Sequence, residues 1–394
     1  MSFKMKSILL KVVPISHPFV NTLYKELSFL YLEKGSFAEA LDYQFKILDI
    51  NIKTKGMDHR VVLGSYHNIA YFYNSQGNYQ KAIEFQLKNI DAQKKQAAIN
   101  AVDLAGAYQN LSNFHSALGE ESLSIEYSLK ELAIKLQEVD EEHEVTIPTY
   151  INLSAAYLAK GEQDLAIEYG QKALKIILKT QKTEEVNTVL TFVYNNLGNC
   201  FEAKGDYQKA IEYYKKSIGI TLKLWGEGHT ELSMNYNNLA NAYNLNGESS
   251  KALAFHQLCI DVAHKTQRAD HPETALYYNN YAATHTEIGN YDKAIELSQK
   301  ALAIQEKTFG KEHPDVALSY LNIGSYYDSK KDYKEAIKAY QNALYSFSKK
   351  LGEKHPFVGQ SYRNLANVQS HTKNYALKPK PITLQKPLFN SIAN

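Results

Sequence analysis

The chain has 394 residues, and its 44 basic and 42 acidic side chains leave a formal net charge of only +2. Nucleic-acid-binding proteins usually concentrate Lys and Arg on one face, and no such concentration is visible, so a nucleic-acid partner is not expected. No apolar stretch approaches the roughly 20 residues that span a bilayer, and Cys200 and Cys259 are too few for a disulfide framework. We therefore expect a cytoplasmic protein that does not associate with membranes.

A histidine recurs along the chain at intervals of 42 residues or close to a multiple of it. The successive intervals are 42, 84, 86, 42, 42 and 42 residues, so one interval contains two additional residues. These joint histidines are His17, His59, His143, His229, His271, His313 and His355. A fixed period of this size predicts a stack of similar units, which can grow without dividing into globular domains. We place the two additional residues in the loop 181–187.

The repeat that begins at His271 predicts a pair of helices. Apolar and small residues three and four apart indicate one helix from Pro272 to an exit at Gly289, because proline suits the first turn and glycine the exit. A second helix then runs from Tyr291 to Lys307. The same pattern along the chain predicts seventeen helices, two in each of eight repeats and one more around 357–368. We call the first helix of a repeat helix A and the second helix B.

Equivalent positions in successive repeats form columns. The exit glycines are Gly35, Gly77, Gly119, Gly161, Gly205, Gly247 and Gly289, replaced later by Lys331 and Lys373. A small residue recurs in helix A at Ala70, Ser112, Ser154, Gly198, Ala240, Ala282, Gly324 and Ala366. Small residues permit close helix crossings, so this column predicts core packing. Trp225 shares a position with Phe309 and is expected to pack in the turn between repeats.

The two ends depart from the pattern. Residues 6–11 align with the end of a helix B, so we interpret 1–16 as the tail end of a partial preceding repeat, and the chain as starting inside an array. The repeats are expected over 17–377. Residues 378–394 contain three prolines, Pro379, Pro381 and Pro387, which prevent another helix B. We expect this Pro- and Lys-containing tail to be flexible.

The order aromatic, Leu, small, aromatic, Gly, Tyr, Ala, Ile resembles the tetratricopeptide repeat. The 42-residue period and the joint sequence at 310–317, Gly-Lys-Glu-His-Pro-Asp-Val-Ala, are similar to the kinesin light chain variety of that repeat. The resemblance covers residues 17 to about 375. It implies an all-α fold, a right-handed superhelical α-solenoid of helical hairpins. The long heptad segment that precedes the repeats in kinesin light chains has no counterpart here, so attachment to a motor protein is not supported.

No arrangement of residues predicts catalysis or metal binding. The joint histidines occur at most once per repeat, and stacked helices place equivalent atoms on the order of 10 Å apart, whereas zinc ligands converge at about 2 Å from one ion. No nucleophile and base can be placed together from the sequence. We therefore expect no enzyme activity, no cofactor and no metal.

An asparagine column stands out in helix A, always two residues after a tyrosine. It comprises Asn68, Asn110, Asn152, Asn196, Asn238, Asn280, Asn322 and Asn364, and further amides flank it at Asn195, Asn199, Asn237, Asn241 and Asn279. Asparagine is a mediocre helix former, so eight in register require a reason. One interpretation is structural: each amide bonds a neighbouring helix and sets the pitch of the array.

The other interpretation is functional and uses the resemblance. In tetratricopeptide proteins this column lines the concave wall, and its asparagines hold the backbone of an extended peptide. A carboxamide donates and accepts, which matches a peptide group. Basic residues are nearly absent beside the column, which favours a neutral, polar segment. We thus predict an interaction scaffold for a protein or peptide partner. Two alternatives are a regulatory array from a larger signalling protein or enzyme, and a kinesin light chain-like cargo adaptor.

Overall fold

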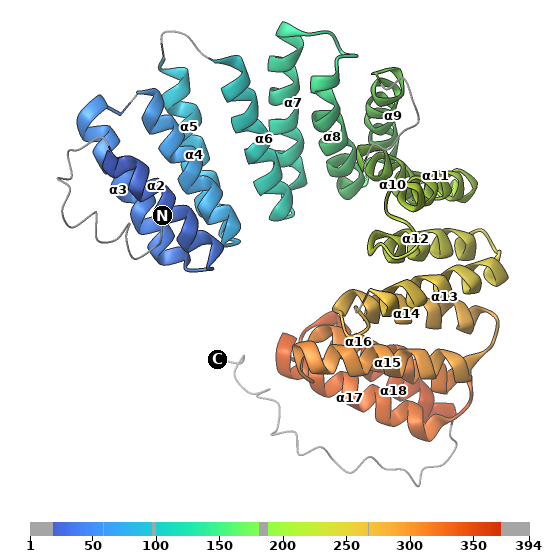
Figure 1. Ribbon diagram of the computed structural model, residues 1–394. Coiled ribbons are helices and arrows are strands. Elements are labelled where there is room, and N and C mark those ends of the chain that lie inside the picture. The colour runs from blue at the N-terminus through green and yellow to red at the C-terminus, as the bar shows by residue number, and fades with distance from the viewer. Residues whose placement is uncertain (1–18, 58, 97–99, 181–187, 267, 372–394) are drawn as a thin grey trace, which may run out of the picture. The chain divides into compact units, whose positions relative to one another are not determined.

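The computed structural model describes residues 19–57, 59–96, 100–180, 188–266 and 268–371 (Figure 1). Within these ranges it contains seventeen α-helices, α2 to α18, one short 3-10 helix and no strand, which confirms the predicted number of helices and the all-α repeat fold. The contacts between Cα atoms divide the chain into two compact units, residues 1–213 and 214–394, with the division inside α11.

The helices alternate between the two predicted kinds. Helix A is represented by α2 (Phe19–Glu33), α4 (Arg60–Ser75), α6 (Ala101–Ala117), α8 (Ile147–Lys160), α10 (Thr188–Ala203), α12 (Glu231–Leu245), α14 (Pro272–Glu287), α16 (Pro314–Ser329) and α18 (Pro356–His371). Helix B is represented by α3 (Phe37–Lys55), α5 (Tyr79–Lys94), α7 (Glu121–Glu138), α9 (Gln163–Thr180), α11 (Tyr207–Trp225), α13 (Ser249–Lys265), α15 (Tyr291–Phe309) and α17 (Tyr333–Leu351). The 3-10 helix η1 (Glu144–Thr146) precedes α8. Each described hairpin packs on the next within its unit, as for α6 with α7 and α7 with α8 (Figure 1).

Aromatic rings and small residues hold each hairpin together. Tyr157 of α8 stacks on Tyr169 of α9 with ring centroids 5.5 Å apart, and Tyr243 stacks on Phe255 in the same way in the hairpin of α12 and α13. The small column of helix A is buried from Ala70 to Gly324. The prediction that this column packs in the core is wrong only at Ala366. This residue is exposed on α18, because no further described helix covers that face.

Gly324 shows why one position in this column must be so small. A Cβ atom added to Gly324 would lie 2.6 Å from ring carbons of Tyr340 on α17. That separation is far below van der Waals contact, and Tyr340 is itself buried. A close approach of helix A to an aromatic ring of helix B therefore requires glycine at this crossing.

The joint histidines lie at the starts of the A helices: His59, His271 and His313 are the N-caps of α4, α14 and α16, and His143 is the N-cap of η1. In all six that the structure describes, Nδ1 accepts a hydrogen bond from the backbone N–H two residues later, as at His313 with the N–H of Asp315 at 3.2 Å. The others are His59, His143, His229, His271 and His355. This bond satisfies one of the N–H groups that a helix start leaves open. Trp225 stacks on His229 at 4.3 Å, which confirms that it packs in the turn between repeats.

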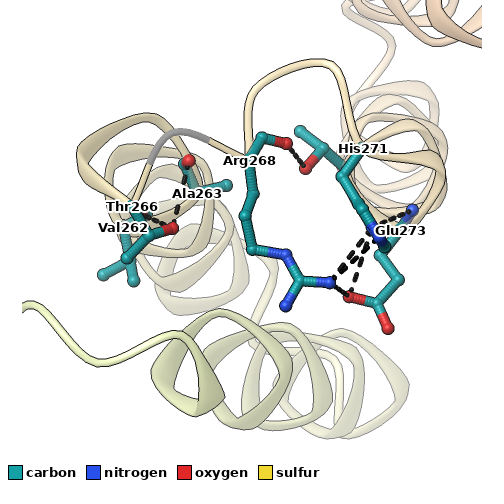
Figure 2. A network of polar contacts seen from close by, with 7 residues as sticks. Val262, Ala263, Thr266, Arg268, His271 and Glu273 are labelled. Carbon is teal, nitrogen blue, oxygen red and sulfur yellow. Dashed lines mark hydrogen bonds and ion pairs between the residues drawn. The ribbon is translucent and has the colours of Figure 1, made fainter. Parts of the chain in front are cut away.

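The turn between α13 and α14 carries an additional polar network (Figure 2). Arg268 takes the position that glycine occupies in four other turns, at Gly56, Gly226, Gly310 and Gly352. Its guanidinium donates to Glu273 at 2.7 Å and lies 3.1 Å from Nδ1 of His271, while Thr274 donates its hydroxyl to the carbonyl oxygen of Arg268. The arginine therefore joins the turn to the first residues of α14.

The exit turns adopt the left-handed conformation that the glycine column predicted. All seven exit glycines have positive φ, and Lys331, which replaces glycine in repeat eight, also has a φ of 64°. Lys331 is the one non-glycine residue with positive φ among the described residues. The fold thus imposes the turn even where the side chain makes it unfavourable.

Several sequence predictions fall on other parts of the chain. The segment 1–16, the loop 181–187, Lys373 and the tail 378–394 lie outside the described residues. Among the helices that are described, none combines the length and the apolar character needed to cross a membrane.

Candidate functional site

The asparagine column lies on one face of helix A, opposite the hairpin core. Two residues along a helix correspond to a rotation of about 200°. Tyr66 and Tyr150 are buried in their hairpins, so Asn68 and Asn152, two residues later, turn away from the core and are partly exposed. Seven members of the column are partly exposed and Asn322 is exposed. The side chains of the column are therefore accessible.

Three members of the column bond neighbouring A helices. Asn196 donates to the Ser154 hydroxyl at 2.8 Å, and Asn152 donates to the Asn113 amide oxygen at 3.3 Å. Asn280 donates to the amide oxygen of Asn237 at 3.0 Å. These are bonds of the kind that the structural interpretation predicts, because each fixes one repeat against the preceding one.

The flanking amides divide in a similar way. Asn237 is buried, and Asn279 donates to the Ser319 hydroxyl of the next repeat at 3.3 Å. The remaining flanking amides, Asn195, Asn199 and Asn241, are partly exposed. The stretch richest in asparagine is thus partly occupied by contacts between helices.

Asn68 and Asn110 differ from these members. Neither forms a hydrogen bond to another described residue, and both line a cavity of about 590 Å³. The cavity lies among α4, α5 and α6, and Lys25 of α2 also contributes to it. Of the predicted residues, these two are the ones that the structure brings together with an open space.

Six of the fifteen residues that line the cavity carry carboxamides, and the sequence analysis missed several of them. Helix α5 contributes Gln86, Asn89 and Gln93, all buried. Asn89 donates to the carbonyl oxygen of Leu63 at 2.7 Å and accepts from Gln93 at 2.6 Å. These residues follow the small residue Ala82 by four, seven and eleven positions, which places them on the inner face of the helix. Amides at positions that periodicity assigns to the core are the signal that could have revealed them.

Two glycines open the cavity toward solvent. A Cβ atom added to Gly64 or Gly106 would meet no other atom within 4 Å. Both glycines lie four residues before a member of the asparagine column, where three later repeats carry Met234, Leu276 and Leu318. The missing side chains therefore expose space that bulky residues occupy elsewhere.

Charge at the cavity is low. Arg60 and Asp103, both at its rim, form an ion pair at 3.8 Å with well-exposed side chains. Lys25 is the other charged group in the lining. With its main cation and anion paired, the site presents neutral donors and acceptors and lacks the cluster of basic groups that would hold an anion.

At the cavity itself, burial lowers the pKa of His67. Two further perturbed titratable groups lie inside the helix packing. Burial raises the pKa of Cys200 to about 11 and lowers the pKa of His256 to about 3. Both side chains are fully buried, so neither is in contact with solvent. In the described part of the chain no three His, Cys, Asp or Glu side chains come together as metal ligands would.

Comparisons with known proteins place this geometry in a family. Family models described as tetratricopeptide repeat match residues 62–95, 103–179, 190–265, 231–307, 273–344 and 329–377. The matches cover more than half of the chain, which therefore belongs to the tetratricopeptide repeat family. A search of the curated proteins finds no match.

Solved structures share the fold. The apo form of RapI has 15% sequence identity and a TM-score of 0.57, over 90% of this chain and 98% of its own. A tetratricopeptide repeat protein from Parabacteroides merdae has 14% identity and a TM-score of 0.53, over 78% and 98%. Repeats of a putative kinesin light chain from Podospora anserina have 24% identity and a TM-score of 0.47, over 53% and 98%. The likeness to RapI and to the Parabacteroides merdae protein, at 15% and 14% identity, establishes the architecture alone.

Proposed function

We propose that the chain is a non-catalytic interaction array whose first unit binds an extended segment of a protein partner along α4 and α6. The observation that carries this proposal is the pair Asn68 and Asn110, which are accessible, have no partner within the described protein and line the same cavity. Carboxamides in such a row match the alternating donors and acceptors of a peptide backbone. The same proposal places the protein in the cytoplasm, where the free thiols of Cys200 and Cys259 stay reduced.

The preceding helix explains why Asn110 is available. Asn152 and Asn196 find partners on the helix A before theirs, at Asn113 and Ser154. The positions equivalent to these partners, one repeat before Asn110, are Tyr71 and Ala70. Neither of those side chains offers an amide or an aliphatic hydroxyl. The counterpart of the third partner, Asn237, is His67, and it forms no hydrogen bond with Asn110 in the described structure. The Asn110 amide is left to bind a ligand.

A pair of double variants tests the proposal. Peptides would first be selected on the intact chain from a displayed library of random dodecapeptides, and their affinities measured by titration. Asn68→Ala with Asn110→Ala should weaken binding about fivefold to 150-fold, since each hydrogen bond is worth about 0.5–1.5 kcal/mol. Its melting temperature should not fall, because alanine is the better helix former.

The matched control is Asn196→Ala with Asn280→Ala. This variant removes the bonds to Ser154 and Asn237, so it should melt at a lower temperature while binding the selected peptides normally when folded. The reverse pattern, with normal binding by the first variant and impaired binding by the control, would contradict a site in the first unit.

A further inference from the structure

The floor of the cavity contains a buried amide without partners. Gln86 has no exposed surface, and neither its Nε2 nor its Oε1 forms a hydrogen bond. The Oε1 atom of the buried Gln93 beside it is also without a partner. An unsatisfied buried polar group is costly, and such groups in native proteins require an explanation. The unused atoms here comprise one donor group and two acceptors.

The surrounding contacts show that these atoms are not needed to hold the helices together. Asn89 connects α5 to α4 through the Leu63 carbonyl, and Gln93 donates to Asn89. In the preceding repeat, the equivalent of Gln86 is Gln44, which donates to the Ser28 hydroxyl at 2.7 Å. The residue equivalent to Ser28 beside Gln86 is Ala70, which has no hydroxyl. The replacement of serine by alanine leaves the Gln86 amide group available.

The chemistry of the lining selects the ligand. Six carboxamides contact the cavity: Asn68, Gln86, Asn89, Gln93, Gln109 and Asn110. An anion would leave the amide oxygens opposed to its own oxygens, and an apolar group would leave the buried amides unsatisfied. A primary carboxamide carries both an N–H donor and an oxygen acceptor on one planar group, which is the complement of the unused atoms of Gln86 and Gln93.

We propose that this cavity is a specificity pocket for a primary carboxamide, presented as the Asn or Gln side chain of the bound segment. The inference rests on the proposed function, because the peptide backbone must lie across Asn68 and Asn110 to direct the side chain inward. Gly64 and Gly106 leave the entrance through which that side chain passes. When the side-chain amide of Gln86 turns toward the entrance, it forms hydrogen bonds with the carboxamide of the ligand.

The test uses the random dodecapeptide library on the intact chain, followed by sequencing of the selected peptides. One position should be enriched in Asn and Gln. For a selected peptide, replacing that residue with Glu or Met should weaken binding about fivefold to 150-fold, corresponding to two hydrogen bonds. Free glutamine and acetamide, titrated alone, should bind far more weakly than the peptide, which separates a peptide side chain from a small-molecule source.

Two variants test the pocket separately from the groove. Gln86→Met should abolish the preference for Asn and Gln but leave the contribution of Asn68 and Asn110 intact. Gly106→Leu places at the entrance the residue that the chain itself carries at Leu276 and Leu318, so the helix should form normally while the side chain is excluded. The control Leu276→Gly, in the second unit, should leave peptide selection unchanged.

The outcomes distinguish the two proposals. Peptides whose binding depends on Asn68 and Asn110, but which show no carboxamide preference or are unaffected by Gln86→Met, would overturn the pocket while leaving the groove. Selection of no peptide at all would overturn the groove, and tight binding of free glutamine would overturn the peptide as the source of the carboxamide. A loss of preference in both pocket variants, with circular dichroism melts no lower than the wild type, would establish the pocket.

Discussion

The two units carry different side chains at equivalent positions on one face of helix A, although the helices themselves are alike. In the first unit, Gly64 and Gly106 leave open space above a floor of buried amides. In the second unit, the equivalent positions carry Met234, Leu276 and Leu318. The comparison shows that a repeat array can contain an open cavity in one region and bulky apolar side chains in another without any change in helix register.

The interiors of the helix B columns differ as well. The position occupied by Gln44 and Gln86 in the first unit is occupied by His256 in the second. His256 is fully buried, its Nε2 lies 3.1 Å from the Thr284 hydroxyl, and its Nδ1 has no partner. An amide is neutral at every pH, whereas a histidine is not, so acid should distinguish the two units.

The largest expected effect is therefore a loss of stability in acid that is concentrated in the second unit. Burial lowers the folded-state pKa of His256 to about 3 from 6.5, so the unfolded chain takes up a proton first as the pH falls. Stability should decline between pH 6.5 and about 3, at about 1.4 kcal/mol per pH unit, or roughly 3 kcal/mol at pH 4. Hydrogen exchange at pH 7 and pH 4 should show α13 and α14 opening most.

His256→Gln supplies the control, since it installs the residue that the first unit uses. This variant should lose most of the decline, as judged by urea unfolding across the same pH range. An unchanged acid profile would mean that other groups control the behaviour, with His285 the first to examine, because burial also lowers its pKa.

The next effect contrasts two glycines in helix A. Gly324→Ala should cost about 1–3 kcal/mol, because the new methyl group meets the Tyr340 ring. Gly64→Ala should stabilise the chain by about 0.5–1 kcal/mol, because its Cβ meets nothing and alanine is the better helix former. Urea unfolding of both variants checks the pair. Equal destabilisation would show that the space at Gly64 is not open.

The smallest effect concerns the exit turn of repeat eight. Lys331 has a φ of 64°, in the region that glycine adopts without a Cβ penalty. Lys331→Gly should therefore stabilise the second unit by about 0.5–1 kcal/mol, measured as a rise in the urea midpoint. The converse variant Gly289→Lys should lose a similar amount. A neutral result in both would indicate that the conformation of these turns carries little strain.

The helices, their columns and their turns could be predicted from the sequence, because the same local sequence pattern recurs every 42 residues. Whether each asparagine side chain forms a hydrogen bond to the preceding repeat was harder to predict. Asn110 and Asn196 occupy the same column, yet only Asn196 has a hydroxyl opposite it, on Ser154. The period identifies which column faces which, but the partner depends on one side chain in the preceding repeat. Whether Gln86 is satisfied depends in the same way on Ala70.

The cavity could not be predicted for a related reason. Periodicity assigns Gln86, Asn89 and Gln93 to a buried face, but it does not say whether buried amides satisfy one another. Asn89 and Gln93 do so in part, whereas Gln86 does not. That difference depends on which side chains lie within hydrogen-bonding distance in the folded protein, which the spacing of residues in the sequence does not specify.

The histidine caps have a spectroscopic consequence. A ring whose Nδ1 accepts a backbone N–H carries its proton on Nε2, so five of the joint histidines are held in one tautomer. At His271 the Arg268 guanidinium lies near both ring nitrogens, so this ring is not included. In nitrogen-15 spectra of the imidazole rings the five should form a single group of Nε2–H resonances, separate from free histidine, in which both tautomers exchange. Each ring then reports on the joint that it caps, and the loss of its signal would identify the repeat at which the array begins to open.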